Sequence, residues 1–147
     1  MNREEFIESI KSAGATFAPK ASDRAIELAK HALQQMRAAM LPMPLIDLYK
    51  NFAGGITLGD AVIFGVEEID KPGKSYEIPG IVKINRQISS LPEMRGKVVF
   101  GRNSLFWFGA DVFGNFYMLD NLSLAPVRKY ENMPYRAMRD CLIVGKI

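Results

Sequence analysis

The stretch from Val98 to Asp120 limits the possible fold more than any other part of the chain. It contains three short apolar runs, Val98–Phe100, Leu105–Phe108 and Phe116–Leu119, which are rich in aromatic and β-branched residues and are broken by glycines. Runs of this length and composition, separated by turn residues, predict adjacent strands of a sheet. Almost none of these side chains can take part in covalent chemistry, so the stretch favours a scaffold for binding over a catalytic centre.

The first third of the sequence predicts helices. Asn2 and Glu5 have the spacing of a capping box, and Phe6 and Ile10 follow at helical spacing. A loop is expected from Ala15 to Ala21. A second helix is expected to open at Ser22 and to continue to Leu41-Pro-Met-Pro44, where proline ends it. Its apolar stripe consists of Ile26, Ala29, Leu33, Met36 and Met40. A third, short helix is expected from Pro44 to Phe52, before the glycine pair at 54 and 55.

After residue 56 the pattern changes from helical to mainly extended. The sequence predicts a strand at Ala61–Val66, a turn at Lys71–Lys74, a short helix within Gly80–Leu91, a strand at Ala125–Tyr130 and a last helix from Pro134. The expected fold class is therefore α+β, with a mainly antiparallel central sheet wrapped by N-terminal helices and a C-terminal helix. Because the strands lack clean polar–apolar alternation, we expect cover on both faces of the sheet. Residues 1–147 are expected to form a single domain.

The composition is that of an ordinary globular protein, with 48% hydrophobic and 24% charged residues and a net charge of +3. The positive excess lies in the second half, where ten Lys/Arg face six Asp/Glu, but the longest basic run is only Arg128-Lys129. A nucleic-acid partner is therefore not expected, since such binders cluster their basic residues. No apolar window approaches the roughly 18 residues of a membrane helix. The acidic, amphipathic first residues differ from a secretory signal, so we expect a cytoplasmic protein without membrane contact.

Residues that commonly carry chemistry are few. The single histidine, His31, falls off the apolar stripe of its helix, and the single cysteine, Cys141, lies beside Leu142 on the last helix, where a packed side chain is expected. These two residues cannot form a Cys/His zinc site or a convincing catalytic triad. The glycines at 54, 55 and 59 do not match a phosphate-binding loop. We therefore expect no enzymatic activity, no cofactor and no metal.

The order of several short motifs resembles the SUKH superfamily, which includes fungal cell-wall-synthesis regulators and many bacterial immunity proteins. The motifs are Leu41-Pro42, Leu48–Gly55, Ile63–Ile69, Val99–Arg102, Phe108–Asp111 and Gly114–Asp120. Each motif is short and structural, so the resemblance depends on their order over residues 41–130. Ala53 departs from the pattern, because the family commonly has Asn there.

The resemblance implies an α+β domain that acts by binding another protein. Bacterial members of this kind bind a toxin domain and block it, which needs exposed anchors and complementary charge and no catalytic groups. The expected partner is thus the toxin domain of a polymorphic or contact-dependent system. The alternative is a SUKH-like regulatory or scaffold module that binds a host protein or a small ligand. A third hypothesis is a hydrolase with an unrecognised site.

Candidate partner contacts fall into two groups. Glu67, Glu68 and Asp70 form the densest acidic cluster, which could face a basic toxin. The second group, Arg102, Asn103, Trp107 and Tyr117, lies in or beside the predicted strands. Aromatic residues with a polar handle and turn residues on a rigid scaffold are common in interfaces. Core packing of the two aromatics, turn chemistry for Asn103 and simple solvation of the acidic cluster are the competing explanations.

Overall fold

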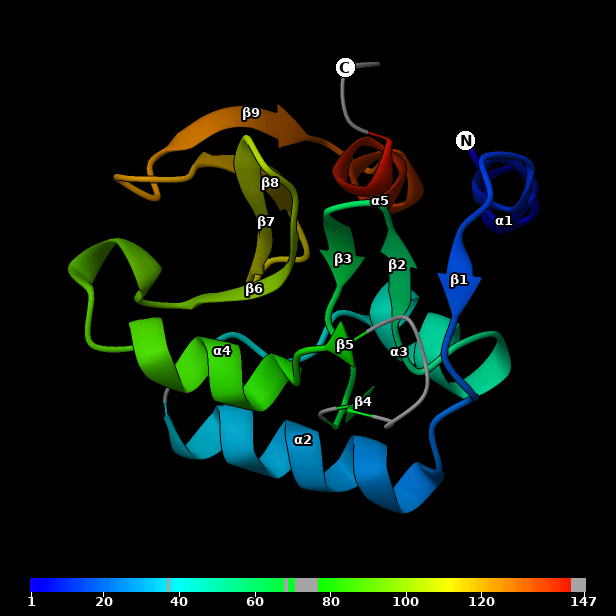
Figure 1. The fold of residues 1–147 in the computed structure, drawn as a ribbon. Coiled ribbons are helices and arrows are strands. Elements are labelled where there is room, and N and C mark those ends of the chain that lie inside the picture. The colour runs from blue at the N-terminus through cyan, green and yellow to red at the C-terminus, as the bar shows by residue number, and fades with distance from the viewer. Residues whose placement is uncertain (37, 68, 71–76, 144–147) are drawn as a thin grey trace.

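One curved antiparallel sheet organises the computed structural model, which describes residues 1–36, 38–67, 69–70 and 77–143 (Figure 1). Within these residues the sheet has seven strands, in the spatial order β1 (Thr16–Phe17), β2 (Ile56–Leu58), β3 (Ala61–Ile63), β6 (Lys97–Arg102), β7 (Phe106–Asp111), β8 (Phe116–Asp120) and β9 (Pro126–Tyr130). Every neighbouring pair is antiparallel. The short strands β4 (Ile69–Asp70) and β5 (Glu77–Ile78) pair with each other, apart from this sheet.

Helices lie on both sides of the sheet. They are α1 (Arg3–Ser12), α2 (Asp23–Gln35), α3 (Met43–Asn51), α4 (Ile81–Ile88) and α5 (Pro134–Leu142), with a 3-10 turn η1 (Pro92–Met94) after α4. In Figure 1, α1 and α5 are on one side, and α2 and α4 are on the other. Helix α5 contacts β3, β6, β7, β8, β9 and α1, whereas α4 contacts β6 and α2. The α+β class is therefore confirmed, with helices on both sides of the sheet.

The three hairpin-linked strands β6, β7 and β8 supply the aromatic centre of the core. The ring of Phe100 lies 5.3 Å from that of Phe116 and 6.4 Å from that of Phe108, centroid to centroid, and all three rings are fully buried. Tilted aromatic contacts at these distances add to the free energy of apolar burial. The prediction that the three apolar runs form adjacent strands of a sheet is therefore confirmed.

Glycine at position 101 lets α5 approach the sheet closely. A Cβ atom on Gly101 would lie 2.7 Å from the carbonyl oxygen of Val62 and 2.8 Å from the Sγ atom of Cys141. On the same side of the sheet, the hydroxyl of Tyr130 in β9 donates a 2.7 Å hydrogen bond to Asp140 of α5, whose carboxylate is almost wholly buried. Helix α5 is thus fixed at both the middle and the edge of the sheet.

The structure departs from the sequence prediction at the end of the second helix. Helix α2 stops at Gln35, several residues before Met40. The chain turns there so that Ala39 is fully buried, and its N–H donates to the carbonyl oxygen of Lys97 in β6. Met40, expected on the buried stripe, is instead 71% exposed. A long-range hydrogen bond and apolar burial thus replace the last turn of the predicted helix.

The strands before β6 were predicted least well. The predicted loop at Ala15–Ala21 contains β1, and β2 follows the glycine pair without having been predicted. The strand expected at Ala61–Val66 ends at Ile63, and Gly65 forms an isolated bridge with Gly80 instead. The turn expected at 71–74 lies outside the described residues. The Asn2–Glu5 capping box, α4, β9 and α5 are confirmed.

Candidate functional site: an aromatic and basic face of the sheet

Three of the predicted contact residues, Arg102, Trp107 and Tyr117, lie on the same face of the sheet. Arg102 is directly opposite Trp107, and Trp107 is opposite Leu119, which is two residues from Tyr117. Residues two apart in a strand share a face, so Trp107 and Tyr117 are diagonal neighbours across β7 and β8. All three of these polar or aromatic side chains are partly exposed, whereas Leu119 is fully buried beneath them.

Lys97 and Lys129 complete this surface, which we call the aromatic–basic face. Lys129 is paired across the sheet with Tyr117, and the Nζ atom of Lys97 lies 5.8 Å from the centroid of the Tyr117 ring. The aromatic–basic face therefore consists of Lys97, Arg102, Trp107, Tyr117 and Lys129, from β6, β7, β8 and β9. These residue types combine large apolar area with donors for acidic groups.

The guanidinium group of Arg102 is held between two rings. Its central carbon is 5.6 Å from the centroid of Phe64 and 5.5 Å from that of Trp107. Both distances are within the range of cation–π attraction. Phe64 is fully buried, so Arg102 rests on a rigid base. This arrangement limits the conformational freedom that Arg102 would lose on binding a partner.

Asp111 positions the hydroxyl group of Tyr117. Its Oδ2 accepts a 2.8 Å hydrogen bond from that hydroxyl, and its Oδ1 accepts from the backbone N–H groups of Phe113 and Asn115. Partial burial opposes ionisation, but these hydrogen bonds outweigh it and hold the pKa of Asp111 below its usual value. Burial and the nearby Asp111 carboxylate raise the pKa of Tyr117. The phenol therefore stays protonated and points in a fixed direction.

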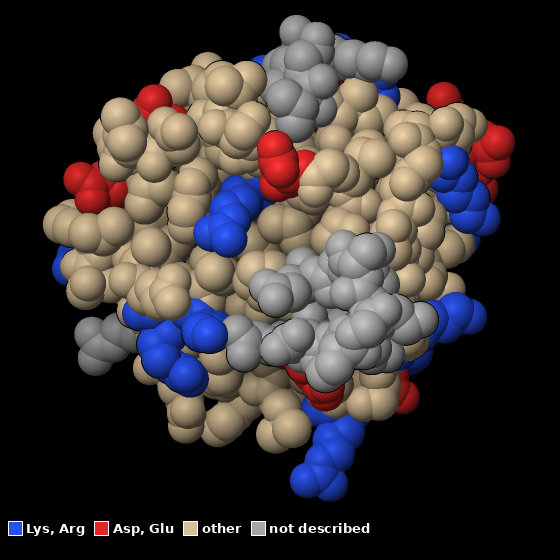
Figure 2. Space-filling model, in the orientation of Figure 1, with Lys and Arg blue, Asp and Glu red and all other residues tan. Residues whose placement is uncertain are grey.

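Charge on this face is mixed rather than uniformly basic. Asp111 lies across from Lys97, and Lys129 forms a 3.4 Å ion pair with Glu131. In the view of Figure 2, Lys and Arg side chains occur in separate groups with Asp and Glu between some of them, and no continuous basic track crosses the visible surface. A patch of this kind suits a protein partner with matching charges better than a phosphate backbone.

The structure corrects the expectation that Asn103 is a partner contact. Only 7% of its surface is exposed. Its Oδ1 accepts hydrogen bonds from the N–H groups of Leu105 and Phe106, and its Nδ2 donates to the carbonyl oxygen of Cys141. The side chain thus closes the β6–β7 turn and ties it to α5, so turn chemistry is its role.

Of the predicted acidic cluster, the structure describes only the side chain of Glu67. Glu67 is exposed, and it lines a shallow hollow together with Lys83 and Arg86, so its surroundings are also mixed in charge. Glu68 lies outside the described residues, and Asp70 is placed only through its backbone pairing with Glu77. No hydrogen bond or ion pair links Glu67 to another described residue.

His31 and Cys141, the residues whose side chains could most readily act as a nucleophile or a metal ligand, do not form a site. His31 is exposed on α2, 3.1 Å from Gln35, and Cys141 is fully buried with its Sγ directed at the carbonyl oxygen of Val62. Burial raises the pKa of the Cys141 thiol strongly. The described part of the chain contains no group of three or more His, Cys, Asp or Glu side chains able to hold a metal ion.

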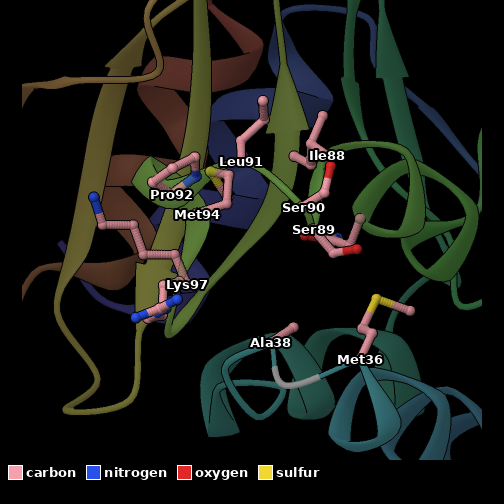
Figure 3. Close-up of a pocket in the computed structure, with 11 residues that line it drawn as sticks. Met36, Ala38, Ile88, Ser89, Ser90, Leu91, Pro92, Met94 and Lys97 are labelled. Carbon is pink, nitrogen blue, oxygen red and sulfur yellow. The ribbon is translucent and has the colours of Figure 1, made fainter.

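A second candidate site is a pocket of about 550 Å³ below the start of β6, between α4, η1 and the end of α2 (Figure 3). It is lined by Met36, Ala38, Asn85, Ile88, Ser89, Ser90, Leu91, Pro92, Met94, Arg95 and Lys97. In Figure 3, Lys97 lies beside Met94 and Pro92, across from Ile88 and Ser89, with Met36 and Ala38 at the lower end. Its size is in the usual range for small-molecule sites, about 300–1,000 Å³.

The sequence did not predict a pocket, and it did not predict Lys97 or Lys129 as site residues. The short turn between β8 and β9 predicts that these strands pair, but only the register shift between Met118 and Leu119 places Lys129, and not Arg128, beside Tyr117. No pattern in the sequence predicts the pocket. Its walls come from segments of α2, α4 and β6 that meet only in the folded chain.

Comparison with protein-family models, with curated proteins and with solved structures finds no match. No helix within the described residues has the length and apolar character needed to cross a membrane.

Proposed function

We propose that this chain is a cytoplasmic protein-binding domain of SUKH type that acts as an immunity protein. It binds the toxin domain of a polymorphic or contact-dependent toxin and neutralises it by occupying its surface, without catalysing a reaction. The resemblance of residues 41–130 to the SUKH motif order supports the family. One structural observation supports the binding role: Arg102, Trp107 and Tyr117 share a partly exposed face.

Those three residue types are the ones most enriched among binding hot spots, where a few side chains supply most of the affinity. Each is held in place by the fold: Arg102 by two rings, Trp107 by its pairing with Arg102 and Leu119, and Tyr117 by Asp111. A preorganised set loses little entropy on association. The aromatic–basic face is therefore the docking surface that we propose.

The charges define the surface expected on the partner. Lys97, Arg102 and Lys129 give the face three cations, and Asp111 and Glu131 lie beside Lys97 and Lys129. The complementary patch on the toxin domain should carry carboxylates opposite Arg102 and an apolar recess for Trp107. This differs from the acidic inhibitor expected for a strongly basic nuclease, so the toxin should be one with an acidic patch.

Co-expression in a growth assay tests the proposal. Candidate toxin domains are expressed with the wild-type chain, and binding of each rescued pair is measured by calorimetry. We expect Trp107→Ala and Arg102→Glu each to weaken binding at least about tenfold and to reduce rescue. Leu28→Ala is the matched control, since Leu28 is 60% exposed on α2, away from the face. Circular dichroism establishes that each variant is folded.

Two results would contradict the proposal. If no toxin domain is bound or neutralised, the immunity role is wrong. If a toxin is neutralised but both Trp107→Ala and Arg102→Glu bind like wild type, the protein is an immunity protein that uses another surface. The substitution Glu67→Lys, which reverses the charge, then tests whether the acidic cluster is that surface.

A regulatory module that binds a small ligand is the second candidate function. The pocket between α2, α4 and β6 is the observation that favours it, because a protein that only presents a surface to a partner does not need such a pocket.

A further inference from the structure

We propose that the pocket between α2, α4, η1 and β6 binds a small amphipathic carboxylate, with an unbranched apolar chain against the methionine-rich wall and its carboxylate at Arg95 and Lys97. This inference does not depend on the proposed toxin partner. It concerns a different region, which shares only Lys97 with the aromatic–basic face.

The walls of the pocket favour an apolar chain. Met36, Ile88, Leu91 and Met94 contribute flexible or branched hydrocarbon surface, and Met94 is only 3% exposed. Methionine side chains adapt to irregular apolar shapes, so such a wall accepts a linear chain without one fixed fit. The pocket nevertheless opens to solvent, because Leu91 at its rim is 41% exposed.

The charge of the lining selects an anion. Among the described lining residues, Arg95 and Lys97 are the charged ones, and both are basic. Neither forms an ion pair with any described residue, so a ligand carboxylate would not have to displace one. The Nζ atom of Lys97 also lies 5.8 Å from the centroid of the Tyr117 ring. A carboxylate between them would accept charge-assisted hydrogen bonds, which are stronger than neutral ones. Arginine can also bind both oxygens of one carboxylate.

The polar groups in and after α4 do not compete with a ligand carboxylate for Arg95 and Lys97. The carboxamide of Asn85 is already bonded to backbone groups of Ile81 and Val99. At the end of α4, the carbonyl oxygen of Ile88 accepts a hydrogen bond from the N–H of Leu91. The hydroxyl of Ser89 already donates to the carbonyl oxygen of Arg86, which leaves the hydroxyl of Ser90 to donate to an anion. Among the described lining residues, an amine ligand would meet two like charges and no carboxylate.

Methionine-methyl NMR tests this proposal directly. The full chain is labelled with 13C at its methionine methyl groups and titrated with octanoate, with octanol and with octylamine. We expect octanoate to shift the Met36 and Met94 signals in a saturable manner. Met43, exposed on α3, and Met118, in the hairpin core, should not move and serve as internal controls. Octanol should bind at least about tenfold more weakly, since it lacks the charge.

Two variants separate charge recognition from simple apolar adsorption. Arg95→Gln removes a charge from an exposed position and should weaken octanoate at least about tenfold while leaving octanol unchanged. Ser90→Trp, also at an exposed position, should fill the pocket and abolish the shifts for every probe. Unshifted Met118 signals establish that both variants keep the fold.

The proposal is wrong if octanoate produces no saturable shift, if octanol or octylamine binds as tightly, or if Arg95→Gln binds octanoate like wild type. If octanoate does not bind in this way, the toxin-binding proposal still stands, because the growth assay depends on Trp107 and Arg102. Conversely, loss of toxin binding in those variants should not change octanoate binding.

Discussion

Asn85 of α4 takes the place of a missing β-strand neighbour for Val99 of β6. The N–H of Val99 donates a 2.9 Å hydrogen bond to the Asn85 Oδ1, and the Asn85 Nδ2 donates a 2.9 Å bond to the carbonyl oxygen of Val99. Strand β3 pairs with β6 only as far as the bond from Phe64 to Phe100, so the next peptide groups of β6 have no strand beside them. One carboxamide therefore supplies both a donor and an acceptor to the open edge.

Asn85→Ala should destabilise the protein by about 2–4 kcal/mol. The substitution leaves both polar groups of Val99 buried without partners, and each such group costs about 1–3 kcal/mol. Urea unfolding followed by circular dichroism measures the change. The matched control is Asn51→Ala, which removes an exposed asparagine bonded to Asp47 and should cost less than about 0.5 kcal/mol. Equal effects for the two variants would show that water replaces the Asn85 bonds.

Gly101→Ala should destabilise the protein by about 1–3 kcal/mol. The new methyl group would overlap the carbonyl oxygen of Val62 and the Sγ of Cys141, which forces either β3 or α5 to move. Cys141→Ala relieves only the contact with sulfur. In a double-mutant cycle, the two substitutions together should therefore cost less than the sum of the single changes. Strict additivity would mean that the clash with Val62 alone determines the effect.

The thiol of Cys141 should react with a thiol reagent only through unfolding. It is fully buried, and burial raises its pKa, so very little reactive thiolate forms in the folded state. As the chain's single cysteine, it reports on one position. The reaction rate in native buffer should be far below that in denaturant and should rise with added urea below the unfolding midpoint. Rapid labelling without denaturant would mean that α5 detaches locally.

Asp111→Asn should reduce stability at neutral pH and have less effect in acid. Because folding lowers the pKa of Asp111, its carboxylate contributes stability above the usual pKa of about 4, and this contribution is lost as the pH falls through the lowered value. The difference from wild type should stay below about 1 kcal/mol, since the group is mostly solvated. Unfolding curves from pH 7 to below pH 4 measure it. A difference that grows in acid would contradict this account.

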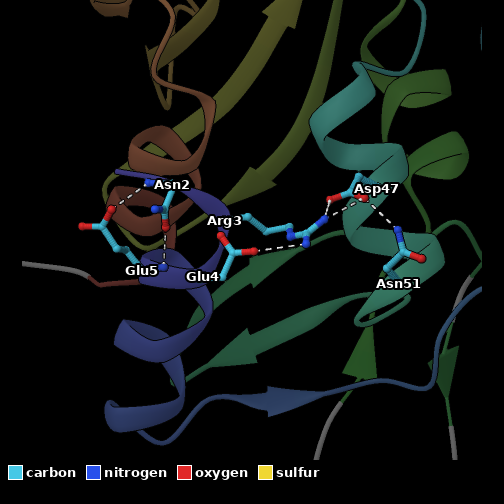
Figure 4. A network of polar contacts seen from close by, with 6 residues as sticks. All are labelled: Asn2, Arg3, Glu4, Glu5, Asp47 and Asn51. Carbon is cyan, nitrogen blue, oxygen red and sulfur yellow. Dashed lines mark hydrogen bonds and ion pairs between the residues drawn. The ribbon is translucent and has the colours of Figure 1, made fainter.

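Arg3 and Asp47 should be coupled in a salt-dependent manner. Figure 4 shows Arg3 of α1 bonded to Asp47 of α3 and to Glu4, and its guanidinium also lies 5.0 Å from the centroid of the Phe52 ring. A double-mutant cycle with Arg3→Met and Asp47→Asn should give a favourable coupling that shrinks at high salt, because partly exposed charges are screened. The pair Lys50–Asp23, whose side chains are more exposed, is the control and should couple more weakly.

Local patterns in the sequence were sufficient to predict the hairpin strands, α4, α5 and the cap of α1. Each depends on residues within one element, such as Asn2 with Glu5 or Gly114 with its positive φ in the β7–β8 turn. The end of α2 and the strands β1 and β2 were missed because distant contacts decide them. Ala39 bonds to β6, and Thr16 pairs with Thr57. Two- and three-residue strands give too little periodicity to detect.

The sequence predicted Arg102, Trp107 and Tyr117 as single candidate contacts, but it did not predict the surface that they share with Lys97 and Lys129. Lys97 and Arg102 are an odd number of positions apart, so a regular strand would place them on opposite faces. The register shift between Val99 and Gly101 inserts Phe100 as an extra residue and brings both cations to the same face. Nothing in the local sequence marks such a bulge. The aromatic–basic face therefore depends on this irregularity in β6 and on the register shift between β8 and β9 that sets Lys129 beside Tyr117.

The contacts of α5 have a consequence for how the chain is assembled. This helix follows every strand in chain order, yet it packs on β3, β6, β7, β8 and β9 and also against α1, where the rings of Phe6 and Tyr135 meet. Helix α1 must therefore wait for α5, which follows it by more than 100 residues, before the apolar side that bears Phe6 is covered. Folding that depends on such distant partners is slow, and during that interval the nascent protein would be a natural client for a chaperone.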